Sequence, residues 1–318
     1  MQASPAIDAV ITWVDGQDPA HIARRAQFSH MPTAQIATEV NAPRRWSYAN
    51  ELDVCLRSIA LHTPWIRKIF IVTDRQTPKG LDVLPKHLKD KIEIIDHTAI
   101  FAGYEGWLPT FNSMAIVGML WRIPNLSDRF ILFNDDTFVA SPCSPEMFFK
   151  GSKTTVFGKW VSLSKPKLKK FKKSIYRMAK LNAAQAIGYS PERFFSSAHI
   201  PIPMRVSVMK DIHVKNPDLF EHNGSARFRA SDQYLVSGLF THYVLKTDQA
   251  DIVKKRCYQN LSSAYCKLAP YWVFRLNCAL IRLMPKRFKL ICVNDLSLLN
   301  ERFGKKAERQ IRKAIGLD

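Results

Sequence analysis

Apolar runs with strand character recur four times in the first 140 residues, and an acidic residue ends each of them. The runs are residues 9–15, 68–74, 91–96 and 129–136, which end in Asp15, Asp74, Asp96 and Asp136. Near-continuous apolar runs of this length are typical of strands buried on both faces of a parallel sheet. Because parallel strands send their carboxyl ends to one edge, we expect these acids to converge on one crevice, where open α/β sheets bind ligands.

Segments with helical periodicity separate these runs. Residues 49–62 place Leu52, Leu56 and Ile59 on one face, and a second helix is predicted from about Ser113 onward with Asn112 or Ser113 as its N-cap. Strands that alternate with helices predict an α/β fold with a doubly wound, mostly parallel, nucleotide-binding sheet. No G-x-G-x-x-G motif follows any strand, so the dinucleotide fingerprint is absent from the sequence.

The composition becomes basic, proline-punctuated and more helical after about residue 150. We therefore predict three parts: an α/β domain over 1–150, a smaller, mainly helical, basic lobe over 151–245, and a C-terminal return to the sheet over 246–318. Within the last part, residues 289–295 form a strand pattern that ends in Asn-Asp, and residues 300–315 form a closing basic helix.

The formal net charge of +20 on 318 residues favours a polyanionic partner such as nucleic acid, acidic polysaccharide or an anionic membrane surface. The excess is concentrated between Lys165 and Lys180, a segment without any acid. Apolar residues recur there at helical spacing, which suits either a basic amphipathic helix on a membrane or a solvated helix that packs its apolar stripe on the protein. With no spanning segment and no secretory signal, we expect a cytoplasmic protein, in peripheral contact with the inner membrane face if the first of these two alternatives holds.

Asn134, Asp135 and Asp136 stand together at the end of the fourth apolar run. Neighbouring carboxylates repel, and a divalent cation relieves that repulsion. Hard oxygen ligands suit Mg²⁺ or Mn²⁺, which would in turn bind a diphosphate. The alternative is a simple turn, since Asn and Asp favour turn positions.

The six cysteines contain no C-x-x-C pair and no metal-finger spacing. Several of them lie within apolar patterns, so we predict reduced thiols in the core.

Four segments resemble, in order, the four conserved regions of the Stealth family. The members of this family are bacterial hexose-1-phosphoryltransferases of capsule and exopolysaccharide synthesis. The lysosomal-enzyme N-acetylglucosamine-1-phosphotransferase of animals is similar to them. The matching segments are residues 7–19 (IDAVITWVDGQDP), 45–136, 182–232 and 291–295 (ICVND). Tyr48 departs from the family, which usually has an acidic residue there, and the usual Pro- and Phe-containing tail is missing. Both departures concern the acceptor more than the chemistry.

The resemblance implies a glycosyltransferase-A-like fold and transfer of hexose-1-phosphate from a nucleoside diphosphate sugar, a UDP-hexose such as UDP-N-acetylglucosamine. The acceptor would be a hydroxyl of a polysaccharide or glycolipid, the product a phosphodiester, and UMP would leave. Matching to the family makes His199 the general base and Arg229 the phosphate clamp, with Arg227 as the alternative clamp. Asp135 and Asp136, helped by Asp295, would hold Mg²⁺ or Mn²⁺.

The same matching assigns a set of donor-binding residues. They are Trp13, Asp15, Gly16, Arg45, Glu51, Arg57, Asn112 and Ser113. Trp13 offers a stacking surface and Asp15 an acceptor for ribose or uracil hydrogen bonds. Core packing is the alternative for Trp13, and helix capping is the alternative for Asn112 and Ser113.

Two other functions compete with this one. A metal-dependent glycosyltransferase of similar fold would use Asn134-Asp135-Asp136 for its metal, attack the anomeric carbon and release UDP. A nucleic-acid-binding protein would explain the charge, but the lysine-rich segment lacks interleaved aromatic residues and a recognised nucleic-acid motif.

Overall fold

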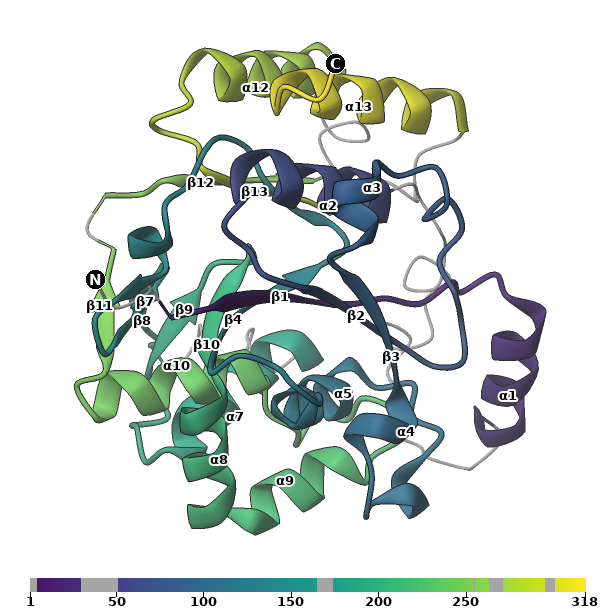
Figure 1. Cartoon of the computed structure of the whole chain (residues 1–318). Coiled ribbons are helices and arrows are strands. Elements are labelled where there is room, and N and C mark those ends of the chain that lie inside the picture. The colour runs from purple at the N-terminus through teal and green to yellow at the C-terminus, as the bar shows by residue number, and fades with distance from the viewer. Residues whose placement is uncertain (1–4, 30–50, 165–173, 254, 263–270, 295–300) are drawn as a thin grey trace.

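A five-stranded central sheet lies between two layers of helices in the computed structural model of the chain (Figure 1). The structure describes residues 5–29, 51–164, 174–253, 255–262, 271–294 and 301–318. The strand order is β10 (Ile202–Arg205), β4 (Arg129–Asn134), β1 (Ile7–Thr12), β2 (Ile69–Thr73) and β3 (Ile92–Asp96). β1 to β4 run parallel and β10 pairs antiparallel with β4, so the predicted mostly parallel, doubly wound α/β sheet is confirmed.

Alternating side chains of the strands build two cores, one on each face of the sheet. Ile7, Ala9 and Ile11 of β1 face the core beneath α2 (Glu51–His62), whereas Val10 faces the core formed with α5 (Ser113–Met119) and α10 (Val236–Lys246). The strands are apolar throughout because both faces are covered.

The helices divide between the two faces. In Figure 1, α2, α12 (Tyr271–Leu283) and α13 (Glu301–Ala314) lie above the sheet. The helices below are α5, α7 (Ile175–Ala186), α8 (Val206–Lys215), α9 (Pro217–Gly224) and α10. Short helices α3 (Lys86–Lys89) and α4 (His97–Ile100) follow β2 and β3, and α1 (Pro19–Ser29) lies at one side. Among the described residues, no helix combines the length and the apolar character needed to cross a bilayer.

Three small sheets accompany the central one. They are β11 (Ala250–Ile252) with β7 (Lys153–Val156) and β6 (Phe149–Lys150), then β12 (Tyr258–Ser262) with β13 (Leu290–Asn294) and β5 (Thr137–Val139), and finally β8 (Gly158–Ser162) with β9 (Arg193–Ser197). The C-terminal part returns to the first part through β13, which pairs antiparallel with β5 rather than joining the central sheet. The part over 151–245 contributes β10 to the central sheet. The boundaries at 151 and 245 stay predictions.

The described cysteines form no disulfide with one another, and four of the five lie in the core, as the sequence predicted; Cys257 is only partly buried. Of the lysine-rich segment, residues 165–173 lie outside the described residues. Its remainder enters α7, whose Ile175 and Ala179 are buried.

Candidate active site

Two adjoining cavities open at the carboxyl ends of β1 and β4. The smaller has a volume of about 240 Å³ and the larger about 490 Å³. They share five lining residues, namely Thr12, Ser113, Asn134, Asp136 and Arg229. Because the two spaces meet at Asp136 and Arg229, one molecule bound in each would meet the other there.

The smaller cavity is lined by residues from the ends of three neighbouring strands. Trp13 follows β1, Asp74 follows β2, and Asp135 follows β4. Asp74 is paired with Arg24 of α1, with 3.2 Å between Oδ2 and Nη2. Convergence of the strand-terminal acids therefore holds for Asp74 and Asp136, which both line this cavity.

The other two strand-terminal acids serve local backbone structure. Asp15 accepts a hydrogen bond from the backbone N–H of Gln17 at 2.9 Å, and Asp96 caps α4 through the backbone N–H of Thr98. Neither lines the two cavities, and the buried Gly16 lies in the turn that follows Asp15.

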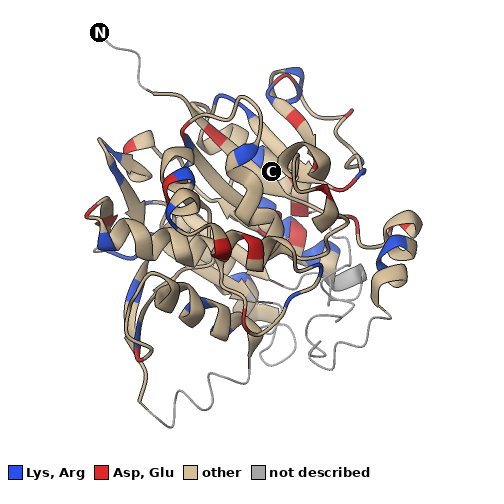
Figure 2. Cartoon of the chain, turned by 90° about the horizontal axis from the view of Figure 1, so that it is seen from below, with Lys and Arg blue, Asp and Glu red and all other residues tan. Residues whose placement is uncertain are grey.

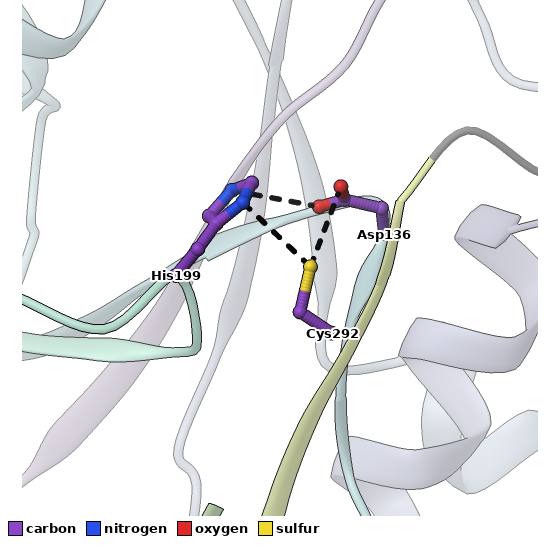
Figure 3. A group of neighbouring side chains, drawn as sticks. All are labelled: Asp136, His199 and Cys292. Carbon is purple, nitrogen blue, oxygen red and sulfur yellow. Dashed lines mark hydrogen bonds and ion pairs between the residues drawn. The ribbon is translucent and has the colours of Figure 1, made fainter. Parts of the chain in front are cut away.

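His199 and Asp136 both line the larger cavity. Figure 3 shows these two side chains beside Cys292. Nε2 of His199 lies 3.9 Å from Oδ1 of Asp136 and 2.6 Å from Nδ2 of Asn134. Sγ of Cys292 lies 3.7 Å from Nδ1 of His199 and 3.6 Å from Oδ2 of Asp136. The acid, the amide and the thiol thus all lie close to the ring, and the thiol also contacts the acid.

Local chain geometry explains why these side chains meet. Asp135 and Asp136 occupy the turn between β4 and β5, which the Thr137 hydroxyl closes by donating to the Asn134 carbonyl at 2.7 Å. His199 lies between β9 and β10, and β10 pairs with β4. The turn that we considered as the alternative to a cation site is present, and it carries both acids to the cavity walls.

Charge repulsion is already visible in the acid pair. Burial, together with the neighbouring Asp136 carboxylate, raises the pKa of Asp135 to about 7. A divalent cation would relieve this repulsion, so the two carboxylates fit the Mg²⁺ or Mn²⁺ expected from the sequence. Asp295, the third predicted ligand, lies outside the described residues.

A second donor set lies beside this one. Ligand atoms of Asp136, His199 and Cys292 all lie within 4.8 Å of one another. Burial, and then the Asp136 charge, raise the pKa of Cys292 well above its ordinary value, so the thiol keeps its proton at neutral pH. A neutral thiol is a poor ligand for a hard cation, and the oxygen donors of Asp135 and Asp136 are the better fit for Mg²⁺.

The two candidate arginines have different surroundings. Arg229 lines both cavities and donates a hydrogen bond to the Ser113 hydroxyl. Arg227 donates to the backbone carbonyls of Gly106 and Leu108 at 3.3 and 3.2 Å and lines neither cavity. Of the two arginines, Arg229 is therefore the one that a molecule in either cavity could contact.

Asn112 connects the helix start to the loop that carries Arg229. Its Oδ1 caps α5 by accepting from the Met114 backbone N–H at 3.0 Å. Its Nδ2 donates to the carbonyl of Ala226 at 2.9 Å and to Oε1 of Gln233 at 3.0 Å. The side chain is fully buried. Because its Oδ1 caps the helix, the capping alternative is confirmed for Asn112. Ser113 instead lines both cavities.

The remaining predicted residues lie farther from the cavities or outside the description. Glu51 begins α2, and its charge contributes to the raised pKa of Cys292. Arg57 pairs with Asp53 at 2.8 Å and lines a separate cavity. Arg45 lies outside the described residues. The roles assigned to these three residues stay predictions.

Sequence reasoning did not select Cys292, Tyr176 or His97 as site residues. Cys292 and Asn294 lie two residues apart on a strand that ends at the site, so their side chains share one face of the strand. This spacing could have indicated from the sequence that both residues belong to the site. Tyr176 lines the larger cavity, and burial of its hydroxyl group raises its pKa to about 12. Burial lowers the pKa of His97, in the smaller cavity, to about 4. Neither residue lies in a local motif.

Two family descriptions match the chain. Stealth protein CR1, conserved region 1, matches residues 5–31, and Stealth protein CR2, conserved region 2, matches residues 45–157. These two matches confirm the first two segments of the resemblance. The segments assigned to the third and fourth regions stay predictions.

Similar proteins carry related names. The exopolysaccharide phosphotransferase CpsY of Mycobacterium tuberculosis is 30% identical over 316 residues, which cover 96% of this chain and 55% of the relative. The capsular polysaccharide phosphotransferase cps12A of Actinobacillus pleuropneumoniae is 41% identical over 160 residues, which cover 50% of this chain and 42% of the relative. The chain spans about half the length, or less, of the curated relatives it matches.

A solved structure of the galactosyltransferase LgtC, in complex with donor and acceptor sugar analogs, is similar over 96% of this chain and 95% of that chain. The TM-score is 0.45 and the sequence identity 12%, so this likeness carries no argument about function. The assignment follows instead from the two conserved regions and the phosphotransferase relatives: the chain belongs to the Stealth protein family.

Proposed function

We propose that this protein transfers hexose-1-phosphate from a nucleoside diphosphate sugar, a UDP-hexose, to a hydroxyl of a polysaccharide or glycolipid, in capsular or exopolysaccharide synthesis. The product is a phosphodiester, and UMP is released. The observation that carries the proposal is that Asp136 and Arg229 line both cavities, while His199 lies 3.9 Å from Asp136 in the wall of the larger one. The names of the phosphotransferase relatives support the reaction class.

The smaller cavity would take the nucleotide. The ring of Trp13, at one wall, offers a surface for the base or ribose, and its 6% exposure shows that most of the ring is used in packing. Asp135 and Asp136 would hold Mg²⁺ or Mn²⁺, which, when bound, neutralises charge on the donor diphosphate. The diphosphate would then lie at the junction of the cavities, beside Arg229.

The larger cavity would take the acceptor sugar. Hydroxyl and amide side chains line it, as sugar binding requires: Ser174, Tyr176, Ser197, Ser237 and Asn294. Its volume of about 490 Å³ is twice that of the neighbouring cavity. His199 lies in its wall and would stand between the acceptor and the donor.

His199 would remove the proton from the acceptor hydroxyl while the hydroxyl oxygen attacks the β-phosphorus in line. The new bond joins that oxygen to phosphorus, and the bond from phosphorus to the bridging oxygen of UMP breaks. Asp136, 3.9 Å from Nε2, stabilises the imidazolium that forms. The Arg229 guanidinium would bind the phosphoryl oxygens, on which charge develops in the transition state.

The test is identification of the nucleotide that is released. Purified protein is incubated with a panel of nucleotide sugars, Mg²⁺ and a glycan acceptor, with His199→Ala as the background control. We expect UMP and a phosphodiester product. Release of UDP with a glycosidic bond would instead identify a metal-dependent glycosyltransferase and would overturn the proposal.

A further inference from the structure

The helix α12 has two apolar faces, and the described residues cover only one of them. Phe274, Cys278 and Ile281 are buried against the core. Trp272, Leu276 and Leu283 are 62%, 49% and 75% exposed. Together with α13, α12 forms the outermost layer of the molecule above the sheet (Figure 1).

The exposed residues form one stripe along the helix. At about 100° per residue, positions 272, 276 and 283 lie within about 40° of one another, opposite the buried residues. Met284, 41% exposed, follows directly after the helix. A helix that is apolar on opposite faces normally has partners on both, and contiguous exposed apolar side chains mark an interaction surface.

Positive charge borders this stripe. Arg275 and Arg282 lie on the exposed part of α12, and Lys286 and Arg287 follow it. Residues 271–289 contain no acidic residue. None of these four cations forms an ion pair with another described residue. On the opposite side of the molecule, basic and acidic residues are mixed over many elements (Figure 2).

We propose that the exposed face of α12 binds an anionic membrane surface. Trp272, Leu276 and Leu283 would enter the boundary between head groups and acyl chains, and the neighbouring cations would contact lipid phosphates. An amphipathic surface with basic residues beside a tryptophan is typical of helices that lie in the membrane interface. This surface is distinct from the segment between Lys165 and Lys180 considered above.

Charge and polarity disfavour the other occupants. A second copy of the chain would bring a net charge of +20 against the same charge, and the basic residues of both stripes would face one another. An acidic glycan would satisfy the cations but would leave the apolar stripe in water. A bilayer with anionic lipids satisfies both groups at once.

Vesicle co-sedimentation tests the proposal. The whole chain is mixed with vesicles of phosphatidylcholine alone or with about one third phosphatidylglycerol. The apolar variant is Trp272→Ala/Leu283→Ala, and the charge variant is Arg275→Gln/Arg282→Gln. Matched controls on other surfaces are Val83→Ala/Val214→Ala, which removes side chains that are 72% and 77% exposed, and Lys210→Gln. Far-ultraviolet circular dichroism checks that each variant is folded.

We expect binding to the anionic vesicles, a fall in the partition coefficient of about ten-fold or more for the apolar variant, and no change for the controls. The charge variant should lose most of the preference for phosphatidylglycerol. Absence of binding by the unaltered chain, or binding that neither α12 variant weakens, would overturn the proposal. So would a dimer in light scattering that the apolar variant converts to a monomer, because the face would then cover a second copy.

Discussion

Nε2 of His199 lies 3.9 Å from Oδ1 of Asp136, and both groups stand in the wall of the same cavity. One residue precedes β10 and the other follows β4, two strands that pair antiparallel in the central sheet. The pairing therefore brings the proposed base beside the proposed cation ligand. Four of our predictions test this arrangement or its supports.

Replacement of His199 by alanine should lower the transfer rate by about two to four orders of magnitude, the usual contribution of a general base. His222→Ala is the matched control. His222 is a partly exposed histidine that lies 3.3 Å from Asp232, and it lines neither cavity. Single-turnover assays with a nucleotide-sugar donor measure the rates. Near-normal turnover by the His199 variant would remove this residue from the mechanism.

Arg229→Lys should lower the rate by about ten- to a thousand-fold, since an ammonium cannot replace the planar fork of a guanidinium on a phosphoryl group. Arg227→Lys is its control. That variant loses backbone hydrogen bonds at Gly106 and Leu108 and should change stability more than rate. If the two variants exchange these effects, Arg227 is the clamp.

Removal of divalent metal with EDTA should abolish transfer, and added Mg²⁺ or Mn²⁺ should restore it. Asp136→Asn should stay inactive at every metal concentration, because it loses a charged ligand and the group that stabilises the imidazolium. Asp251→Asn, which breaks a surface pair with Lys150, is the control and should keep normal rates. Undiminished activity after complete chelation would contradict a metal requirement.

Asn112→Ala should lower the free energy of unfolding by about 2–4 kcal/mol, because it removes a helix cap and leaves buried carbonyls without a donor. Asn112→Asp keeps the capping oxygen and loses the amide donor. It therefore separates the contribution of the helix cap from that of the hydrogen bonds to the loop that carries Arg229. Urea unfolding measures both. Equal stability of all three proteins would show that neither function of the side chain matters.

Acid should destabilise the protein through buried histidines. Burial lowers the pKa of His97 to about 4 and lowers that of His242, both from an ordinary value of 6.5. A folded-state pKa below the unfolded one means that the unfolded chain binds more protons. The contribution of each neutral histidine to the free energy of unfolding is therefore fully present above pH 6.5. It falls as the pH drops below that value, toward pH 4 for His97, by at most about 1.4 kcal/mol per pH unit for each group.

Urea unfolding at pH 7.5, 6.0 and 5.0 measures this loss. His242 accepts from the Phe195 backbone N–H at 2.9 Å through Nε2, so His242→Gln removes the titrating group and keeps an acceptor. The pH slope of this variant should be smaller than that of the unaltered chain. An identical slope would exclude His242 as a source of the pH dependence.

Periodicity predicted the strands well because their burial on both faces leaves a strong local signal. It placed the four parallel strands and located α2, α5 and α13. The strand ends differ by up to three residues, since Asp15, Asp74 and Asp136 lie in the turns that follow. Local pattern says little about a turn that is shaped by distant contacts, such as that between Gln76 and Asp15.

The candidate site likewise contains residues that the sequence could predict and residues that it could not. Asp135, Asp136 and Trp13 could be predicted because they follow strands whose direction is fixed by the fold. The choice between Arg227 and Arg229 could not, because it depends on which guanidinium the loop at Gly106 and Leu108 binds. The assignment of His199 needed resemblance, since one histidine in a loop has no periodic signal of its own.

Cys292 reaches the proposed base only because β13 pairs with β5, across a separation of 156 residues between Cys292 and Asp136. Contacts of such long range carry a larger loop-closure cost than those of the local helices and neighbouring strands. A chain that lacks β13 would therefore leave the proposed base without its neighbouring thiol.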